Sequence, residues 1–210
     1  MATILSPSAS LESGDRLTRE EFHRRYCARP DIAKAELVQG VVYVSSPVRH
    51  GVHSKQHGIV ILWLGTYATA HPELDVSDNA TLYVDSESEL QPDAALFRLS
   101  SSGGSVRITE HGYLEGVPEL IVEVAASSAS YDLHDKMEVY RRAGVPEYVV
   151  WRVLDKGIDW FDLIDGRYVR RGPDAHGIIE SRTFPGLRLD VAAMLGEHRG
   201  RVLAALRLIP

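Results

Sequence analysis

The sequence predicts a single domain of mixed α/β or α+β class. Along its 210 residues, short β-branched runs typical of strands alternate with longer stretches in which apolar residues recur at helical spacing. No internal repeat and no linker rich in Pro, Gly or Ser divides the chain. A chain of this length can also bury a sizeable core. We therefore expect the helices and strands to share one domain.

The N-terminal region is expected to hold a tail and a capped helix. Residues 1–15 are rich in Ser and are predicted to be a flexible tail, so that the domain spans 16–210. Thr18, followed three residues later by Glu21, forms a capping box that begins a helix. This helix is expected to end near Pro30.

A hairpin, a helix and two strands are predicted next. The segment ELVQGVVYVS (36–45) is typical of two short strands joined by a Gln-Gly turn. From about 52 to 70, apolar residues have the period of a helix. Strands are expected at 79–84 and 93–98, and the polar turn between them carries acids that we expect to be solvated: Asp85, Glu87 and Glu89.

The C-terminal half is predicted to alternate between strands and helices. An apolar strand containing Glu123 precedes a helix over about 132–143, which Ser130 can cap and Gly144 ends. Residues 157–190 carry no acid–base cluster and are expected to build the fold or an interface. The other expected elements are a strand at 147–153, an Asp-Gly hairpin of 159–163 and 167–169, a strand at 178–183 and a helix at 196–207.

The composition excludes several classes of protein. With 23 basic and 29 acidic residues, the net charge is −6, which argues against coating nucleic acid through a uniformly basic surface. Cys27 is the only cysteine, so no internal disulfide can form. Neither a signal-peptide pattern nor an apolar run long enough to cross a bilayer is visible. We expect a cytoplasmic protein without a membrane partner.

Three polar residues stand out because of the elements that carry them. Asp93 follows Pro92 at the start of a strand, and Glu123 interrupts an apolar run built for burial. A buried carboxylate needs a cation, an ion-pair partner or a solvent-filled cleft. Lys136 lies on the next helix, about 60° from the buried Leu133, so its ammonium can reach toward the Glu123 strand. Two carboxylates and a lysine suit metal-assisted hydrolysis of a phosphodiester.

These residues resemble the Uma family, restriction-endonuclease-like members of the PD-(D/E)XK nuclease superfamily. The likeness rests on Pro-Asp at 92–93, the Glu-Val pair at 123–124 and the helical Lys136. It extends over nearly the whole chain through LTREEF (17–22), ELVQG (36–40), His53 at a helix start, QPDAALF (91–97), PELIVEVAASS (118–128), DLHDKMEVYRRAGVPEYVVW (132–151), the Asp-Gly hairpin and FPGLRLD (184–190).

The resemblance implies a restriction-endonuclease-like domain with a central mixed sheet, flanking helices and added β-hairpins. It also implies cleavage of DNA with Mg²⁺ or Mn²⁺, with Asp93 and Glu123 as metal ligands, Lys136 as the catalytic lysine and Glu36 as a third acid near the metal. The superfamily places its lysine two residues after the glutamate, where this chain has Ala125. The resemblance therefore implies that the lysine has moved to the helix. A homodimer would suit cleavage of both strands.

Each candidate residue also has a structural interpretation. Asp93 can begin a strand or cap a turn. Glu123 can be an ion-pair partner of Lys136 that joins helix to sheet. Lys136 taken alone can be a solvated helix residue. Glu36 is balanced between a strand-surface acid and an acid of the site.

The histidines near the second predicted helix suggest a weaker hypothesis. His53 and His57 have the i, i+4 spacing of half a zinc site, but no HExxH pattern accompanies them. His53 can line the cleft, whereas His50 and His57 are expected to face solvent.

Two functions of different classes therefore stay open. One is a metal-dependent DNA endonuclease. The other is a catalytically inactive nuclease fold used for binding or assembly, which the net charge of −6, Ala125 and the lack of a separate DNA-reading domain favour. A Mg²⁺ or Mn²⁺ ion between Asp93 and Glu123 would distinguish the first from the second.

Overall fold

A six-stranded mixed sheet forms the centre of the protein. The computed structural model describes residues 10–45, 49–126 and 129–208. The sheet contains β3 (Leu74–Asp78), β5 (Ala94–Arg98), β8 (Leu120–Ala125), β9 (Glu147–Arg152), β10 (Gly157–Ile164) and β11 (Arg167–Arg171). Its order is β11-β10-β9-β8-β5-β3, and of these neighbours only β8 and β9 are parallel. The predicted fold class, with a central mixed sheet and flanking helices, is confirmed.

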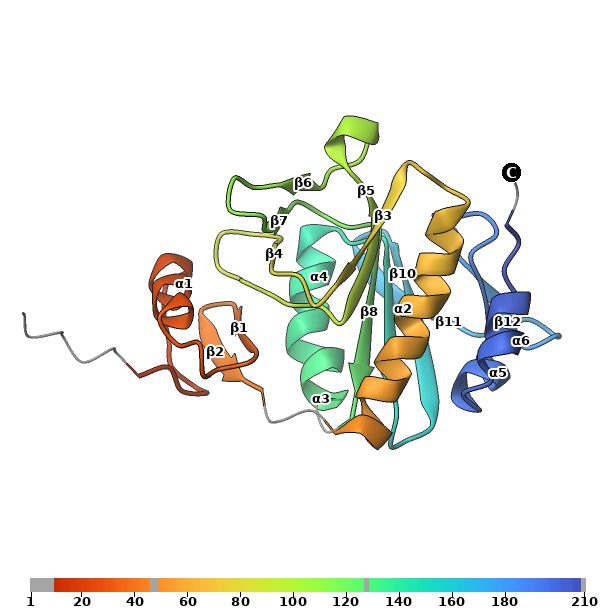
Figure 1. Cartoon of the computed structure of the whole chain (residues 1–210), viewed down its shortest axis with the longest axis horizontal. Coiled ribbons are helices and arrows are strands. Elements are labelled where there is room, and N and C mark those ends of the chain that lie inside the picture. The colour runs from red at the N-terminus through yellow and green to blue at the C-terminus, as the bar shows by residue number, and fades with distance from the viewer. Residues whose placement is uncertain (1–9, 46–48, 127–128, 209–210) are drawn as a thin grey trace, which may run out of the picture.

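Helices cover both faces of this sheet (Figure 1). On one face lies α2 (Ser54–Thr69), whose Trp63 belongs to the same core cluster as Val122 and Val124. On the other lies a continuous helical segment of α3 (Ala129–Tyr131), the π-helical η3 (Asp132–Lys136) and α4 (Met137–Ala143). Its Tyr140 shares a second cluster with Ile121. Since successive residues of a strand point to opposite faces, β8 must be apolar on both, and all six of its residues are buried.

The N-terminal elements form a small lobe beside the sheet (Figure 1). It comprises α1 (Arg19–Cys27), β1 (Ala35–Val38) and β2 (Val41–Val44), which enclose a third core cluster. Thr18 caps α1 by accepting a hydrogen bond from the Glu21 amide, as predicted. The hairpin turn at Gln39 and Gly40 has φ of 49° and 77°, and positive φ at both residues suits a two-residue hairpin. The predicted helix and hairpin are therefore confirmed.

Residues 10–15, which we expected in the flexible tail, pack against this lobe. Leu11 is 4% exposed and belongs to the third core cluster. The amide of Gly14 donates to the carbonyl of Val42 at 2.8 Å. The apolar side chain of Leu11 explains the packing, since its burial removes hydrocarbon from water. The rest of the predicted tail, residues 1–9, lies outside the described residues.

The C-terminal region builds the far edge of the sheet and covers its α2 face. Asp165 and Gly166 form the predicted turn between β10 and β11, with φ of 48° and 74°. Further along, buried Glu147 of β9 accepts hydrogen bonds from Ser181 Oγ at 2.5 Å and from the Arg182 amide at 2.7 Å. These contacts fasten the segment that contains β12 (Ile178–Glu180), β13 (Arg188–Asp190), α5 (Val191–Leu195) and α6 (Arg199–Ala204).

Several short elements differ from the prediction. The strand expected at 79–84 is only β4 (Leu82–Tyr83), in a three-stranded sheet with β7 (Leu114–Glu115) and β6 (Arg107–Ile108). The helix expected at 196–207 is α6 alone, and Ser130 lies inside α3 instead of capping it. Short strands depend on partners far away in the chain, which local periodicity does not reveal. None of the described helices is long and apolar enough to cross a membrane.

The turn that ends α4 provides a test of this architecture. Gly144 has φ of 88°, and an added Cβ would meet no atom within 4 Å. Gly144→Ala should therefore lower the free energy of unfolding by about 1 kcal/mol through backbone strain alone. Gly172→Ala is the control, because that glycine also has open space but no left-handed φ. Urea denaturation of both variants measures the difference, and equal stability would contradict the assigned turn.

Candidate functional site

Glu123 is the buried carboxylate around which the candidate site is built. It lies in the middle of β8 and is 2% exposed. Its side chain points to the face covered by η3 and α4, where Tyr140 donates a hydrogen bond to its Oε1 at 3.1 Å. The Lys136 ammonium lies 2.5 Å from the same oxygen. The carboxylate that interrupts the apolar strand is thus compensated by a cation and a phenol.

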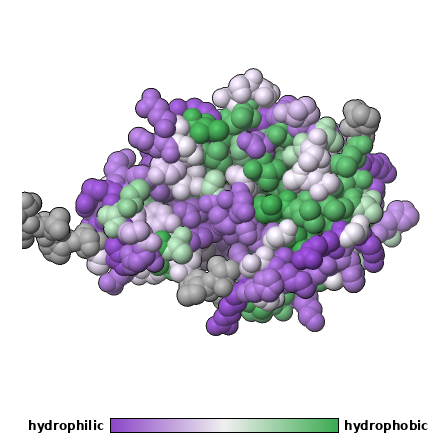
Figure 2. Space-filling model, in the orientation of Figure 1, coloured by the Kyte–Doolittle hydropathy of each residue, from purple (hydrophilic) through white to green (hydrophobic). Residues whose placement is uncertain are grey.

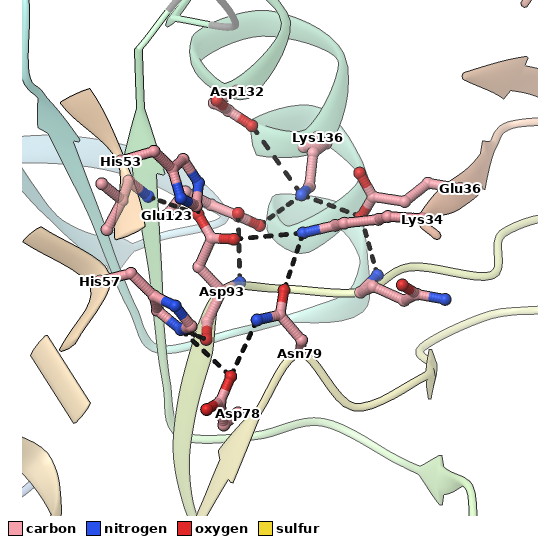
Figure 3. Close-up of polar contacts among 12 residues, drawn as sticks. Lys34, Glu36, His53, His57, Asp78, Asn79, Asp93, Glu123, Asp132 and Lys136 are labelled. Carbon is pink, nitrogen blue, oxygen red and sulfur yellow. Dashed lines mark hydrogen bonds and ion pairs between the residues drawn. The ribbon is translucent and has the colours of Figure 1, made fainter. Parts of the chain in front are cut away.

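Lys136 is enclosed by acids from three parts of the chain. Its Nζ lies 3.0 Å from Glu36 Oε1, 2.5 Å from Glu123 Oε1 and 3.8 Å from Asp132 Oδ1, and its side chain is 1% exposed. Figure 3 shows this ammonium between its own helix and the carboxylates of Glu123 and Glu36. Glu36 Oε1 also accepts the amide of Gln91 at 2.7 Å, which fixes the acid to the chain just before Asp93.

Asp93 lies immediately before β5 and is held by contacts on both carboxylate oxygens. Oδ2 accepts the amide of Val124 at 2.8 Å and lies 3.2 Å from His53 Nε2. Oδ1 accepts a hydrogen bond from the Lys34 ammonium at 3.1 Å. The backbone amide of Asp93 in turn lies 3.4 Å from Glu123 Oε2. The pairing of β5 with β8 brings the two candidate metal ligands together.

The structure therefore brings together all four candidate site residues, Glu36, Asp93, Glu123 and Lys136 (Figure 3). Their roles as metal ligands and catalytic lysine stay predictions, because a purely structural ion-pair network would show the same contacts. A hollow lined by hydrophilic residues lies beside the N-terminal lobe, between that lobe and the start of α2 (Figure 2).

Lys34, Asn79 and Asp78 join the site although the sequence did not indicate them, and His57 joins it as well. Lys34 donates to Asp93 and, at 3.1 Å, to Asn79 Oδ1. His57 Nε2 lies 2.8 Å from the carbonyl oxygen of Asp93 and 3.2 Å from Asp78 Oδ1. Lys34 stands two residues before Glu36, and the alternation of a strand would have placed both on one face.

Two expectations of solvent exposure were wrong. We expected His57 to face solvent, but its side chain is 14% exposed because the i, i+4 spacing with His53 turns both rings toward Asp93. We also expected Glu89 in a solvated turn, but it is 1% exposed and its carboxylate lies 3.0 Å from His23 Nδ1. Backbone pairing of Glu89 with Leu37 draws it under the N-terminal lobe.

Ala125 is packed in the core, which leaves no room there for a charged side chain. It lies on the same face of β8 as Glu123, is 0% exposed and belongs to the core cluster of Tyr140 and Val139. A lysine side chain there would have to fit beneath α4. The ammonium reaches Glu123 from η3 instead, and π-helical turns are frequently found at functional sites.

Burial and neighbouring charge shift the protonation equilibria of the site in opposite directions. Burial raises the pKa of Glu123 to about 8 despite the opposing charge of Lys136, and the nearby carboxylate of Asp93 adds to the rise. Burial acts in the same direction on Asp93, but the hydrogen bond from His53 and the charge of Lys34 outweigh it and hold its pKa well below the usual value. Burial opposes the charge of Lys136, yet Glu123 and Glu36 keep its pKa well above the usual value.

The donor set limits which metals the site could hold. Within 10–45, 49–126 and 129–208, no group of three or more His, Cys, Asp or Glu side chains could hold a metal ion. The zinc hypothesis for His53 and His57 gains no support, since both Nε2 atoms already face oxygens of the Asp93 residue. The pair of carboxylates Asp93 and Glu123 remains, with oxygen donors of the kind that Mg²⁺ prefers.

The central mixed sheet with flanking helices and the comparisons with known proteins agree on a restriction-endonuclease-like protein. The family described as "Uma2: Putative restriction endonuclease" matches residues 19–192. The chain belongs to this family, and the predicted resemblance is confirmed. No curated protein matches the chain at a significant level.

A solved structure supports the same fold. It is described as a "putative nuclease belonging to DUF820" from Anabaena variabilis ATCC 29413, and it superposes with a TM-score of 0.63 at 11% sequence identity. The alignment covers 82% of this chain and 96% of that chain. At this identity the similarity shows a shared fold.

Because several acids surround Lys136, removing the lysine should destabilise the protein more than removing one of the acids. Lys136→Met should lower the free energy of unfolding in EDTA by about 3–5 kcal/mol, because Glu36 and Glu123 would lose their buried cation. Glu123→Gln should cost less than about 1 kcal/mol near pH 7, because Lys136 keeps Glu36 and Glu123, with a pKa of about 8, is already largely neutral there. Urea denaturation measures both, and equal losses would make Glu123 a structural ion-pair partner.

The raised pKa of Glu123 predicts a dependence of stability on pH. The unfolded carboxyl titrates near 4.5 and the folded one near 8, so between these values the folded state binds the extra proton and stability falls as pH rises. Between pH 6 and 8 this group should remove roughly 2 kcal/mol from the metal-free protein. Glu123→Gln should flatten that part of the profile. Denaturation in EDTA at several pH values compares parent and variant, and parallel profiles would contradict the shift.

Proposed function

We propose that the protein is a metal-dependent DNA endonuclease in which Asp93 and Glu123 hold Mg²⁺ or Mn²⁺. The supporting observation is an excess of buried carboxylates. Four acids, each no more than 4% exposed, meet two lysines: Glu36, Asp93, Glu123 and Asp132 with Lys34 and Lys136. Counted as ionised groups, they sum to 2 − 4 = −2, which one divalent cation would offset.

The chemistry of the donors suits such a cation. Mg²⁺ usually keeps several waters and is bound by one or two carboxylates together with phosphate oxygens of the substrate, so two acids suffice. Of the site's carboxylate oxygens, Glu123 Oε2 is weakly engaged, because its contact with the Asp93 amide is 3.4 Å long. Asp93 Oδ1 is opposed by the ammonium of Lys34 alone among the contacts described above.

The chain's own residues would orient these ligands. The Val124 amide and His53 hold one oxygen of Asp93, while Tyr140 and Lys136 hold one oxygen of Glu123. Side chains locked in this way lose little entropy when the substrate arrives. The bound cation would polarise the phosphate and lower the pKa of the attacking water.

DNA is proposed as the substrate because the family is described as a restriction endonuclease family. With a net charge of −6, the chain requires a local site for a polyanion, and the hydrophilic hollow beside the lobe is a suitable location (Figure 2). We further propose that the protein acts in the cytoplasm, as its single cysteine suggested, and as a homodimer that cuts both strands.

Conservative substitutions of the two proposed ligands test the function. Asp93→Asn and Glu123→Gln keep the side-chain size but remove ligand charge, so nicking of supercoiled plasmid in Mg²⁺ or Mn²⁺ should fall by at least about 100-fold. Binding of Mn²⁺, measured by calorimetry, should weaken in parallel. Asp165→Asn is the matched control, since that exposed turn residue has a positive φ that Asn tolerates.

Assays of the unsubstituted protein distinguish between the two open functions. Nicking that requires the divalent cation and disappears in EDTA supports the endonuclease. A parent protein that folds, binds no Mn²⁺ and cuts neither plasmid nor short duplex would contradict it and leave the inactive binding module.

A further inference from the structure

The two lysines of the site differ in their access to a substrate. The Lys136 ammonium is surrounded by Glu36, Glu123 and Asp132, and its side chain is 1% exposed. The Lys34 side chain is 21% exposed and contacts one carboxylate, that of Asp93, at 3.1 Å. Figure 3 shows Lys34 entering from the side of Glu36, with its ammonium between Asp93 and Asn79. A phosphate that approaches the acids can therefore reach Lys34 without displacing a buried ion pair.

Lys34 is also positioned more firmly than an ordinary surface lysine. Its carbonyl accepts the amide of Ser45 at 2.9 Å, at the open end of the β1–β2 hairpin. Its ammonium donates to Asn79 Oδ1, and the amide group of Asn79 donates to Asp78 at 2.8 Å. Asp78 in turn lies 3.2 Å from His57 of α2. A chain of polar contacts thus holds the ammonium between the N-terminal lobe and the sheet.

We propose that Lys34 is the lysine that contacts the scissile phosphate, and that Lys136 is a positioning residue that holds Glu123. This inference rests on the proposed endonuclease function. In the metal-free protein, Lys34 neutralises the Oδ1 side of Asp93. Once a divalent cation binds Asp93, Lys34 is the lysine of the site whose side chain is partly exposed and whose ammonium no longer has to neutralise that acid. An ammonium there stabilises the negative charge that develops on the phosphoryl oxygens.

Because Lys34 and a metal ion would share Asp93, replacing Lys34 should change metal binding and DNA binding in ways that can be measured. Lys34 competes with a cation for Asp93 Oδ1, so Lys34→Gln should raise the affinity for Mn²⁺ by about two- to fivefold. The same change should remove one phosphate contact. The slope of log K against log salt for a duplex should then become shallower by about 0.9. The single-turnover rate should fall by about 100-fold.

The experiment uses the full-length protein and three readouts. Calorimetry measures Mn²⁺ binding, fluorescence anisotropy in Ca²⁺ measures binding of a fluorescein-labelled duplex of mixed sequence over a salt series, and quenched-flow measures single-turnover cleavage in Mg²⁺. Lys34→Arg should keep the parent's salt slope because it keeps the charge. Lys156→Asn is the control for charge removal, since exposed Lys156 has φ of 51°, which Asn tolerates. Melting temperatures in EDTA confirm that each variant is folded.

The outcomes separate this inference from the proposed function. A parent protein without Mn²⁺ binding or metal-dependent cleavage overturns both. An active parent whose salt slope and cleavage rate are unchanged in Lys34→Gln overturns the role of Lys34 alone. Weaker Mn²⁺ binding by Lys34→Gln also overturns it, because the lysine would then support Asp93 structurally. A shallower slope, slower cleavage and tighter Mn²⁺ binding in the same variant support it.

Discussion

The ion cluster of Lys136 is the interaction on which the rest of the site depends. One ammonium contacts Glu36 of the N-terminal hairpin and Glu123 of the central strand, and the cation itself is carried by η3. Three elements that are far apart in the chain therefore meet at one charge. Burying a charge without a partner is costly, so moving any one of these elements away would leave an unpaired charge in the interior.

The helix after β8 departs from regular α-helical geometry in the segment that supplies this lysine. Residues Asp132–Lys136 are π-helical, and Lys136 is the last of them. Tyr148 donates to the carbonyl of Asp132 at 2.8 Å, which ties the first π-helical residue to β9. Lys136 thus reaches Glu123 of β8 from the helical segment that follows this strand.

The N-terminal lobe and α2 complete the site from its other sides. The lobe supplies Lys34 and Glu36, and α2 with its preceding residue supplies His57 and His53. Both contribute to fixing Asp93, which lies at the start of β5 between them. The sheet therefore provides the two proposed ligands, while the surrounding elements decide their charge, their orientation and which of them a substrate can approach.

The sequence by itself determined the local features of this protein. Helical periodicity predicted α2, a continuous apolar run predicted β8 and an Asp-Gly turn predicted the hairpin of β10 and β11, because all three signals depend on neighbouring residues. A charge within an apolar strand likewise marked Glu123 as needing a partner. Family resemblance pointed to Asp93, Glu36 and Lys136 for the same site. Their roles in catalysis stay predictions.

Only the tertiary structure decided the features that arise from contacts between distant segments. The short strands β4, β6 and β7 have little pattern of their own and exist through mutual pairing. The burial of His57, like the contact between Lys34 and Asp93, requires the lobe, α2 and β5 to meet. Local sequence specifies which residues can be charged or apolar, whereas the packing of elements determines which charges are close enough to interact and which remain open to solvent.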